Sequence, residues 1–200
     1  MSHPMRILRI DSSAKTETSE SRRLTDRIIN GLQANEKSLE VTVRDLNEHL
    51  PQLDRAWIEA NNTPTDDHTD EQRKTLALSD MLVAEIEAAD TLIIGVALYN
   101  FAISASLKLW IDLICRARKT FAYSDGGPKG LMIGKKAIVC FASGGTQFGS
   151  DIDFASSYLR HILSFIGITD VTFISADKHF IDSQSLTNAN ATVDALTKQL

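Results

Sequence analysis

Four short segments rich in apolar and β-branched residues punctuate the chain, and each has the length of a buried strand rather than of a membrane span. They are Arg6–Ile10, Thr91–Ala97, Lys136–Ala142 and Val171–Ser175. The nearly uninterrupted apolar run of Thr91–Ala97 is typical of a strand buried on both faces of a sheet. A fifth segment, Glu40–Leu46, alternates between apolar and polar residues. The pattern therefore predicts five strands.

Between these segments, apolar residues recur at the three- and four-residue spacing of amphipathic helices. The five predicted helices have apolar faces within Leu24–Leu32, Leu76–Ile86, Leu107–Cys115, Phe154–Ile166 and Leu186–Leu200. Thr69, with Gln72 three residues later, fits a capping box that opens the second helix. Asp151 or Asp153 can cap the fourth helix, and Gly167 fits its end.

Two segments lack a periodic pattern and are predicted to be irregular. Leu50–Asp67 is polar, contains two prolines and a lone Trp57, and is interpreted as a surface excursion. Lys119–Gly134 combines several glycines with a proline, which predicts a loop with turns rather than a helix or strand.

The alternation of five strands with five helices predicts an α/β fold with a parallel sheet covered on both faces. Right-handed crossovers leave few topologies. For five strands we expect the doubly wound, flavodoxin-like order 2-1-3-4-5, whose ligand crevice lies where strands 1 and 3 diverge. With 200 residues and no linker or repeat, residues 1–200 are predicted to form a single domain.

Composition narrows the functional classes only a little. The net charge of −5 argues against a general nucleic-acid binder and offers no basic stripe for a membrane surface. No apolar run reaches the roughly 18 residues of a transmembrane helix, and Met1–Ile10 lacks the features of a signal peptide. Cys115 and Cys140 form no CxxC motif and lie in apolar segments, as expected of core thiols in a reducing cytoplasm.

A loop rich in hydroxyl groups follows the first predicted strand and leads into a helix. It contains Ser12, Ser13, Thr16, Thr18, Ser19 and Ser21. Backbone N–H groups and the positive end of the helix would hold a phosphate there, with hydroxyls adding hydrogen bonds. An equally reasonable interpretation is that these side chains only cap and solvate the loop. The loop has neither the GxGxxG pattern of a dinucleotide site nor the GK[ST] of a P-loop.

Two further loops lie at the same predicted edge of the sheet. Leu98-Tyr99-Asn100-Phe101 follows the third strand and offers flat aromatic contacts and an amide that can bond to the edge of a polar ring. Ser143-Gly144-Gly145 follows the fourth strand, and its glycines let the backbone approach a planar ligand. Each loop alone could be packing or a plain turn. Together with the hydroxyl-rich loop they indicate a mononucleotide with an aromatic ring, such as FMN.

Other chemistries find no support in the sequence. The end of the third strand lacks the acceptor carboxylate of a phosphorelay receiver, and no serine sits in a GxSxG motif. The acidic run Asp66–Asp70 is interpreted as a solvated helix entry rather than a metal site. We therefore expect no metal site and no catalytic protein nucleophile.

Over nearly its whole length the chain resembles the FMN-dependent NADH-azoreductases, flavodoxin-like quinone reductases of bacteria. The stretches that carry the resemblance are Ser12-Ser13, Ser19-Glu20-Ser21, Tyr99-Asn100-Phe101, Leu107-Lys108, Asp112, Phe121-Ala122-Tyr123, Gly127-Pro128, Gly130-Leu131, Gly134–Ala137, Ser143-Gly144-Gly145 and Phe165–Ile168. The Tyr-Asn-Phe turn followed by the Phe-x-Tyr and Gly-Pro-x-Gly-Leu segments is specific to this group.

The resemblance implies roles for particular residues. Ser13, Ser19, Glu20 and Ser21 would hold the FMN phosphate and ribityl chain. The ring would be lined by Leu98, Tyr99, Asn100, Phe101, Ala142, Ser143, Gly144 and Gly145, with Asn100 at its pyrimidine edge. The family is homodimeric with flavins near the interface, where Phe121, Tyr123 and Phe165 would wall the acceptor pocket. Three positions depart from the family: Ala97 replaces a usual proline, Ala142-Ser143 a common Ser-Arg, and Lys178 a frequent glycine.

The implied activity is a ping-pong NAD(P)H:quinone oxidoreductase and azoreductase of the cytoplasm. NADH or NADPH would pass hydride to bound FMN, and a quinone or azo compound would then take two electrons. A flavodoxin-type electron carrier without its own substrate is the main alternative, although such carriers usually have a more acidic docking face. A flavin-free interaction protein on the same scaffold is a third.

Overall fold

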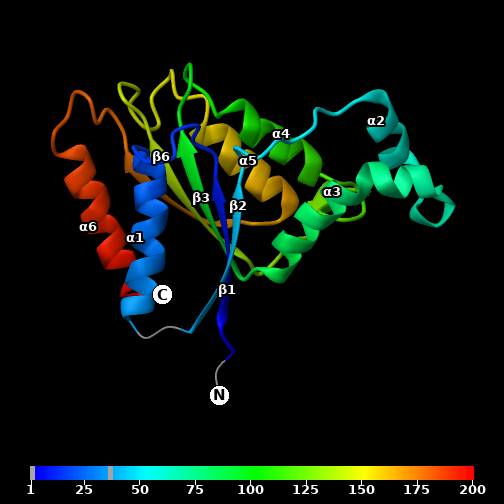
Figure 1. Ribbon diagram of the computed structural model, residues 1–200, viewed down its shortest axis with the longest axis horizontal. Coiled ribbons are helices and arrows are strands. Elements are labelled where there is room, and N and C mark those ends of the chain that lie inside the picture. The colour runs from blue at the N-terminus through cyan, green and yellow to red at the C-terminus, as the bar shows by residue number, and fades with distance from the viewer. Residues whose placement is uncertain (1–2, 36–37) are drawn as a thin grey trace.

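A five-stranded parallel sheet forms the centre of the computed structural model, which describes residues 3–35 and 38–200 (Figure 1). Its strands are β1 (Met5–Asp11), β2 (Leu39–Asp45), β3 (Thr91–Ala97), β6 (Lys136–Ala142) and β7 (Asp170–Ala176). They are ordered β2-β1-β3-β6-β7. This is the predicted order 2-1-3-4-5, and all four strand pairs are parallel. The flavodoxin-like topology is therefore confirmed.

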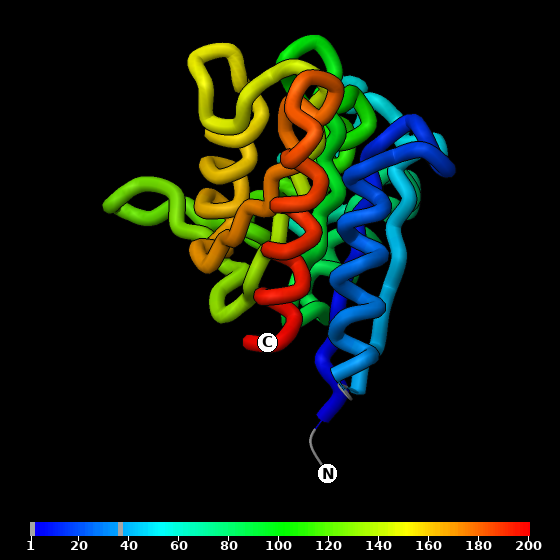
Figure 2. The backbone as a smooth tube through the Cα atoms, turned by 90° about the vertical axis from the view of Figure 1, so that its left-hand side faces the viewer, coloured from blue at the N-terminus to red at the C-terminus, as the bar shows by residue number. Residues whose placement is uncertain are grey.

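Helices cover both faces of the sheet and divide the core in two (Figures 1 and 2). On one face, α1 (Glu20–Ala34) and α6 (Ser185–Thr197) pack against the sheet. On the other face lie α3 (Asp70–Ala88), α4 (Ala105–Ile114) and α5 (Ser156–Ile166). The central strand β3 contributes Ile93 to the core beneath α1 and α6 and Leu92 to the core beneath α3, α4 and α5. Burial on both faces explains why its sequence is apolar throughout.

The helix ends match the sequence signals closely. Thr69 and Gln72 form the predicted capping box at the start of α3. At α5, the Asp153 carboxylate accepts hydrogen bonds from the backbone N–H groups of Ala155 and Ser156, both at 3.0 Å. Asp153, rather than the exposed Asp151, therefore satisfies the first turn of this helix. Gly167 ends α5 in the left-handed conformation, with φ of 104°.

The prediction that Leu50–Asp67 is wholly irregular is wrong. This segment contains α2 (Arg55–Asn62) and a 3₁₀ turn, η1 (Thr65–Asp67). Trp57 is buried, and the guanidinium of Arg116 lies over its ring at 5.5 Å. Trp57 and Ala60 are the only buried residues of α2, so the helix has too few apolar positions to show a periodic pattern.

The prediction that Lys119–Gly134 has no regular structure is also wrong. β4 (Phe121–Ser124) and β5 (Gly127–Gly130) pair as an antiparallel hairpin. The chain after the hairpin is tied to the end of α5, because the Met132 N–H donates to the Ile166 carbonyl oxygen at 2.8 Å. Glycine at position 130 permits this packing, since a Cβ there would lie 2.1 Å from the backbone nitrogen of Gly167.

Among the described residues, no helix has both the length and the apolar character needed to cross a membrane. The first two residues of Met1–Ile10, the segment interpreted as lacking a signal peptide, lie outside the described residues.

The contact between Gly130 and Gly167 yields a stability prediction. Gly130→Ala should lower the free energy of unfolding by about 3 kcal/mol, because two backbone segments must move apart to admit the methyl group. Gly126→Ala is the matched control in the same hairpin, since its Cβ would meet only the Ser124 hydroxyl at 4.0 Å. Urea denaturation of both variants measures the difference, and equal stabilities would contradict the packing described.

Candidate functional site

The loops after β1, β3 and β6 meet at the carboxyl edge of the sheet, where parallel α/β folds bind ligands. Together with the loop after β7 they enclose a cavity of about 140 Å³. The cavity is lined by Ser13, Lys15, Thr18, Ser19, Glu20, Ser21, Ala97, Leu98, Tyr99, Ala142, Ser143, Gly144, His179 and Phe180. The structure thus brings together the three loops singled out in the sequence. Of the residues predicted to bind a cofactor, all but Asn100, Phe101 and Gly145 line this cavity.

The hydroxyl-rich loop after β1 combines structural and available hydroxyl groups. Ser12 is buried and donates to the Gly95 carbonyl oxygen at 2.7 Å, so it joins β1 to β3 rather than facing a ligand. Ser19 is the N-cap of α1, and its hydroxyl accepts from the Arg22 N–H at 3.3 Å. The Ser19 and Ser21 hydroxyl oxygens lie 3.1 Å apart at this helix start. The positive end of α1 and these hydroxyls suit an anionic group.

The loop after β3 is a tight turn held in a strained conformation. The Tyr99 N–H donates to the Ala102 carbonyl oxygen at 3.0 Å, and the Ala102 N–H returns a bond to Tyr99 at 3.1 Å. Asn100 and Phe101, between them, have φ of 49° and 69°. Two successive positive φ values define a type I′ turn, which usually requires Asn-Gly. Phe101 is an exposed aromatic residue in that costly conformation, which is a feature of functional sites.

Tyr99 also connects this turn to the first loop. Its hydroxyl accepts from the Ala14 N–H at 3.0 Å and lies 3.4 Å from the Ser13 hydroxyl. The phenol therefore fixes the distance between the turn after β3 and the loop after β1. The Phe154 N–H donates to the Phe101 carbonyl oxygen at 3.1 Å and holds the turn from its other side.

The loop after β6 is covered by the loop after β7. The His179 N–H donates to Ser143 and the Phe180 N–H to Gly144, each at 3.1 Å. A Cβ at position 144 would lie 2.5 Å from the Phe180 ring, so glycine permits the ring to lie against the backbone. Lys178 turns the chain with φ of 53°, a value that favours glycine.

His179 and Phe180 line the cavity but were not predicted from the sequence. Only their position after a strand at the carboxyl edge could have suggested them, because neither belongs to a polar cluster. The predicted acceptor-pocket residues form a separate group. Phe121 lies 4.4 Å from Phe165 and 5.5 Å from Tyr123, measured between ring centroids, and none of the three lines the cavity.

The two cysteines lie in core surroundings. Burial raises the pKa of the Cys115 thiol to about 12 and raises the pKa of Cys140 as well. Both thiols are therefore protonated near neutral pH and are poor nucleophiles. Among the residues that the structure describes, no group of three or more histidine, cysteine or acidic side chains is arranged to hold a metal ion.

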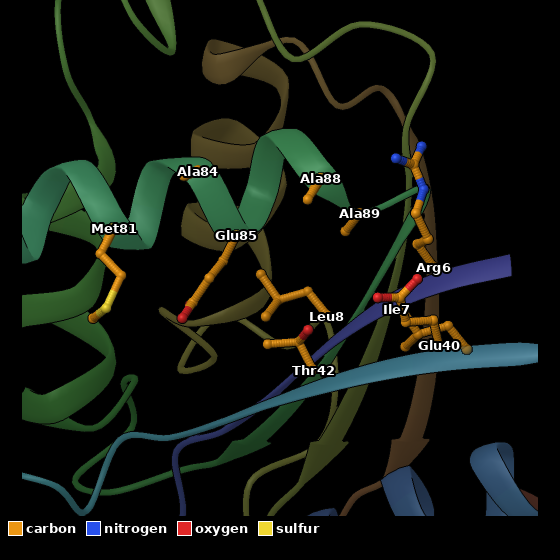
Figure 3. A pocket seen from close by; sticks show the side chains of 10 residues that line it. All are labelled: Arg6, Ile7, Leu8, Glu40, Thr42, Met81, Ala84, Glu85, Ala88 and Ala89. Atoms are coloured by element: carbon orange, nitrogen blue, oxygen red, sulfur yellow. The ribbon is translucent and has the colours of Figure 1, made fainter. Parts of the chain in front are cut away.

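A larger cavity of about 290 Å³ lies at the other end of the sheet, between α3 and the start of β1 and β2 (Figure 3). Arg6, Leu8 and Thr42 approach it from the strands, and Met81 and Glu85 from α3. It contains none of the residues singled out in the sequence. We therefore assign the candidate site to the smaller cavity, where the loops from the carboxyl ends of the strands converge.

Comparisons with known proteins identify the family of this chain. Residues 5–200 match the family described as flavodoxin-like fold. A relative named FMN-dependent NADH:quinone oxidoreductase 1, from Jannaschia sp. (strain CCS1), is 58% identical over 176 residues, which cover 88% of this chain and 90% of the relative. One of the same name from Hahella chejuensis (strain KCTC 2396) is 48% identical over 200 residues, 99% of this chain and 98% of the relative.

Solved structures give the same fold. An FMN-dependent NADH-azoreductase from Bacillus anthracis str. Ames Ancestor, in complex with FMN, has a TM-score of 0.87 with 23% identity, and the match covers 98% of each chain. The azoreductase from Bacillus anthracis str. Sterne has a TM-score of 0.89 with 24% identity over 98% of this chain and 100% of that one. At these identities the likeness shows the fold alone.

The conformation of Lys178 yields a prediction about the loop that covers the site. Lys178→Gly should raise the free energy of unfolding by about 0.5–1 kcal/mol, because relief of the left-handed conformation outweighs the added freedom of the unfolded chain. Lys178→Ala keeps the strain and removes the same side chain, so it should not stabilise the protein. Denaturant titration compares the two, and an equal effect of both variants would contradict strain at this position.

Proposed function

The chain belongs to the family with the flavodoxin-like fold, and from this premise we propose that it is an FMN-dependent NADH:quinone oxidoreductase that also reduces azo compounds. One observation carries the proposal: three loops with complementary chemistry meet at one cavity. They belong to a chain 58% identical to a relative with that quinone oxidoreductase name. In our proposal residues 1–200 act as a single FMN-binding domain.

The residues at the cavity fit the phosphate end of FMN. The hydroxyls of Ser13, Ser19 and Ser21 and the start of α1 would hold the phosphate and ribityl chain, with Glu20 beside them. At about 140 Å³ the cavity is smaller than the roughly 300–1,000 Å³ of most ligand pockets. The ring of FMN would therefore extend past the cavity along the turn after β3.

The surroundings of that turn fit a flat ring. Leu98–Phe101 would line one side, with Asn100 bonding to the pyrimidine edge, and Ala142–Gly145 would close the other. Gly144 supports this assignment, since a backbone without a Cβ lets a planar group approach as closely as the Phe180 ring now does. Ala97 and Ala142, the last residues of β3 and β6, are paired in the register of these two strands, just before the two loops begin.

The bound flavin would accept hydride from NADH or NADPH and deliver two electrons to the acceptor. The protein's own residues would bind and orient these molecules in turn. Backbone N–H donors at the two loops would stabilise negative charge on the reduced ring. We assign no residue as a nucleophile, and the protonated thiols of Cys115 and Cys140 agree with this.

We further propose a homodimer in the cytoplasm, with the two sites near the interface. Phe101, Phe154 and Tyr123 are large apolar side chains left exposed in the single chain. Such exposure favours a partner surface. In the dimer, the side chains of Phe121, Tyr123 and Phe165 would form a wall of an acceptor pocket. That pocket would belong to whichever of the two sites lies closer to the β4–β5 hairpin.

The activity can be tested directly. Purified protein with added FMN should bind the flavin, seen in its visible spectrum. In the absence of oxygen it should turn over NADH or NADPH repeatedly only when a quinone such as menadione is present, because a single hydride transfer to the flavin needs no acceptor. Parallel double-reciprocal lines at several menadione concentrations are expected of a ping-pong enzyme. Bound flavin without turnover of either NADH or NADPH would contradict the proposed oxidoreductase activity. A stable one-electron semiquinone on photoreduction would then favour the electron carrier.

The role of Tyr123 gives a second test. The residue is 77% exposed at the hairpin, so Tyr123→Ala should raise the KM for the quinone by about tenfold through lost aromatic contact and leave the Kd of FMN unchanged. Val43→Ala, an exposed apolar residue on the edge strand β2, is the control. Sedimentation velocity of the same samples should give twice the chain mass of 22.1 kDa. An unchanged KM in Tyr123→Ala would contradict a role for this side chain in the acceptor pocket. A fully active monomer would contradict the homodimer.

A further inference from the structure

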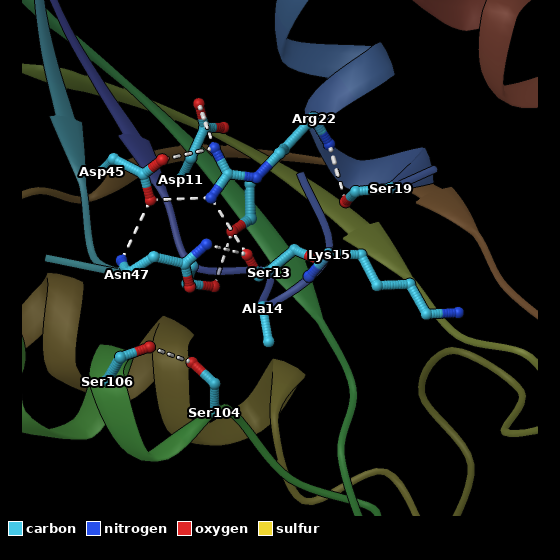
Figure 4. Close-up of polar contacts among 12 residues, drawn as sticks. Asp11, Ser13, Ala14, Lys15, Ser19, Arg22, Asp45, Asn47, Ser104 and Ser106 are labelled. Carbon is cyan, nitrogen blue, oxygen red and sulfur yellow. Dashed lines mark hydrogen bonds and ion pairs between the residues drawn. The ribbon is translucent and has the colours of Figure 1, made fainter. Parts of the chain in front are cut away.

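Arg22 lies directly behind the loop proposed to hold the phosphate, yet it does not line the cavity. Figure 4 shows its guanidinium between the end of β2, the end of β1 and the hydroxyl-rich loop. It bonds to both carboxylate oxygens of Asp45, at 2.9 and 2.7 Å, and donates to the Ser13 carbonyl oxygen at 3.0 Å. Arg22 is buried, and its bond to the Ser13 carbonyl oxygen is buried with it, whereas Asp45 is partly exposed.

The Ser13 carbonyl oxygen is held by two donors. Besides Arg22, the side-chain amide of Asn47 donates to it at 3.1 Å. A carbonyl oxygen has two lone pairs, and both are therefore used on the side facing Arg22 and Asn47. On the other side of the loop, the Tyr99 hydroxyl accepts from the N–H of Ala14. The peptide after Ser13 is thus fixed at both its oxygen and its nitrogen.

This fixed peptide matters to an anion in the cavity. A carbonyl oxygen turned toward a phosphate would repel it, whereas N–H and hydroxyl groups attract it. By holding the carbonyl outside, Arg22 and Asn47 keep it away from the cavity that Ser13 lines. The loop then needs little rearrangement when the anion binds, and preorganisation of this kind increases affinity.

Arg22 also counters two carboxylates close to the site. Asp11 is buried, and its Oδ2 lies 3.6 Å from Arg22 Nη1, while Asp45 follows on the neighbouring strand. The guanidinium hydrogen bonds lower the pKa of Asp45, and those same bonds raise the pKa of Arg22. Asp45 is therefore ionised at neutral pH. Arg9 pairs with Asp11 at 2.7 Å and with Asp26, and it does not take the place of Arg22 at Asp45.

We propose that Arg22 is a positioning residue that makes this pocket prefer a phosphorylated flavin over the same flavin without its phosphate. It does so by holding the Ser13 carbonyl outside the cavity and by neutralising Asp45 beneath the loop, where it also adds to the pairing of Asp11 with Arg9. The inference rests on the proposed function, because it assigns to one residue the recognition of the phosphate of FMN. Asn47 holds the same carbonyl without charge and so contributes a smaller share.

FMN and riboflavin differ only in the phosphate, so their Kd values isolate this effect. Arg22→Gln should raise the Kd of FMN by about tenfold or more and that of riboflavin by less than about twofold. Arg22→Lys keeps the charge but not the fork of donors and should fall between wild type and Arg22→Gln. Asn47→Ala should raise the Kd of FMN less than Arg22→Gln does. Quenching of flavin fluorescence measures each Kd without relying on turnover.

Arg27→Gln is the matched control. Arg27 lies on the same helix and makes the same two-bond pair with a carboxylate, Asp194, at 2.7 Å for each bond, but on an exposed surface away from the loop. It should leave both Kd values unchanged. Thermal unfolding of the flavin-free variants checks that they fold, and Arg22→Lys tests the inference even where Arg22→Gln does not fold.

The outcomes separate the inference from the function on which it rests. Equal rises in the Kd of FMN and riboflavin for the Arg22 variants would make Arg22 merely structural, and an unchanged Kd of FMN would also overturn the inference, with the proposed function intact. Wild-type protein that binds neither flavin would overturn both. A loss confined to FMN, graded from Arg22→Lys to Arg22→Gln, supports the proposal.

Discussion

The parallel pairing of β1, β3 and β6 is the constraint on which the site depends. In this register Asp11 lies beside Gly95 and Ala97 beside Ala142, so the loops that follow the three strands begin at the same level. Helices bury both faces of these strands. A slip of one residue would exchange the residues packed on each face, and the core does not permit it. The distance between the three loops is therefore set by the sheet rather than by the loops themselves.

Three of the four described non-glycine residues with positive φ lie at this edge, where the rigid sheet can support the strain; the fourth, Arg118, precedes the hairpin. Asn100, Phe101 and Lys178 all have positive φ, and each belongs to a loop that follows a strand of the sheet. Hydrogen bonds from neighbouring loops hold these conformations, as between Phe154 and Phe101. Strain of this kind persists only where the surrounding structure fixes it, and it is concentrated at functional sites. The side chain of Phe101 is consequently exposed, where a ligand or a partner can contact it.

The sequence predicted the sheet and the three loops because both depend on local signals. Buried strands such as Thr91–Ala97 need continuous apolar runs, and their order follows from the rules of crossover connections. The hairpin β4–β5 was missed because Gly127, Pro128 and Gly130 look like turn residues. Its pairing is fixed by contact with Gly167, which is distant in sequence. His179 and Phe180 were missed for a similar reason, since only the bonds to Ser143 and Gly144 bring their loop over the site.

Arg22 shows most clearly why part of a site is invisible in a sequence. A cation in the first turn of a helix opposes the helix dipole, and burying it has a further cost. Inspection of the helix alone would rank Arg22 as an unfavourable residue without a function. Its position is stable because Asp45 and Asp11 come from neighbouring strands in register. The same two acids would repel a phosphate if the guanidinium were absent. The carboxylates of Asp45 and Asp11 thus stabilise the buried guanidinium of Arg22, and their negative charge near the phosphate is what Arg22 offsets. The pairing of neighbouring strands brings these groups together.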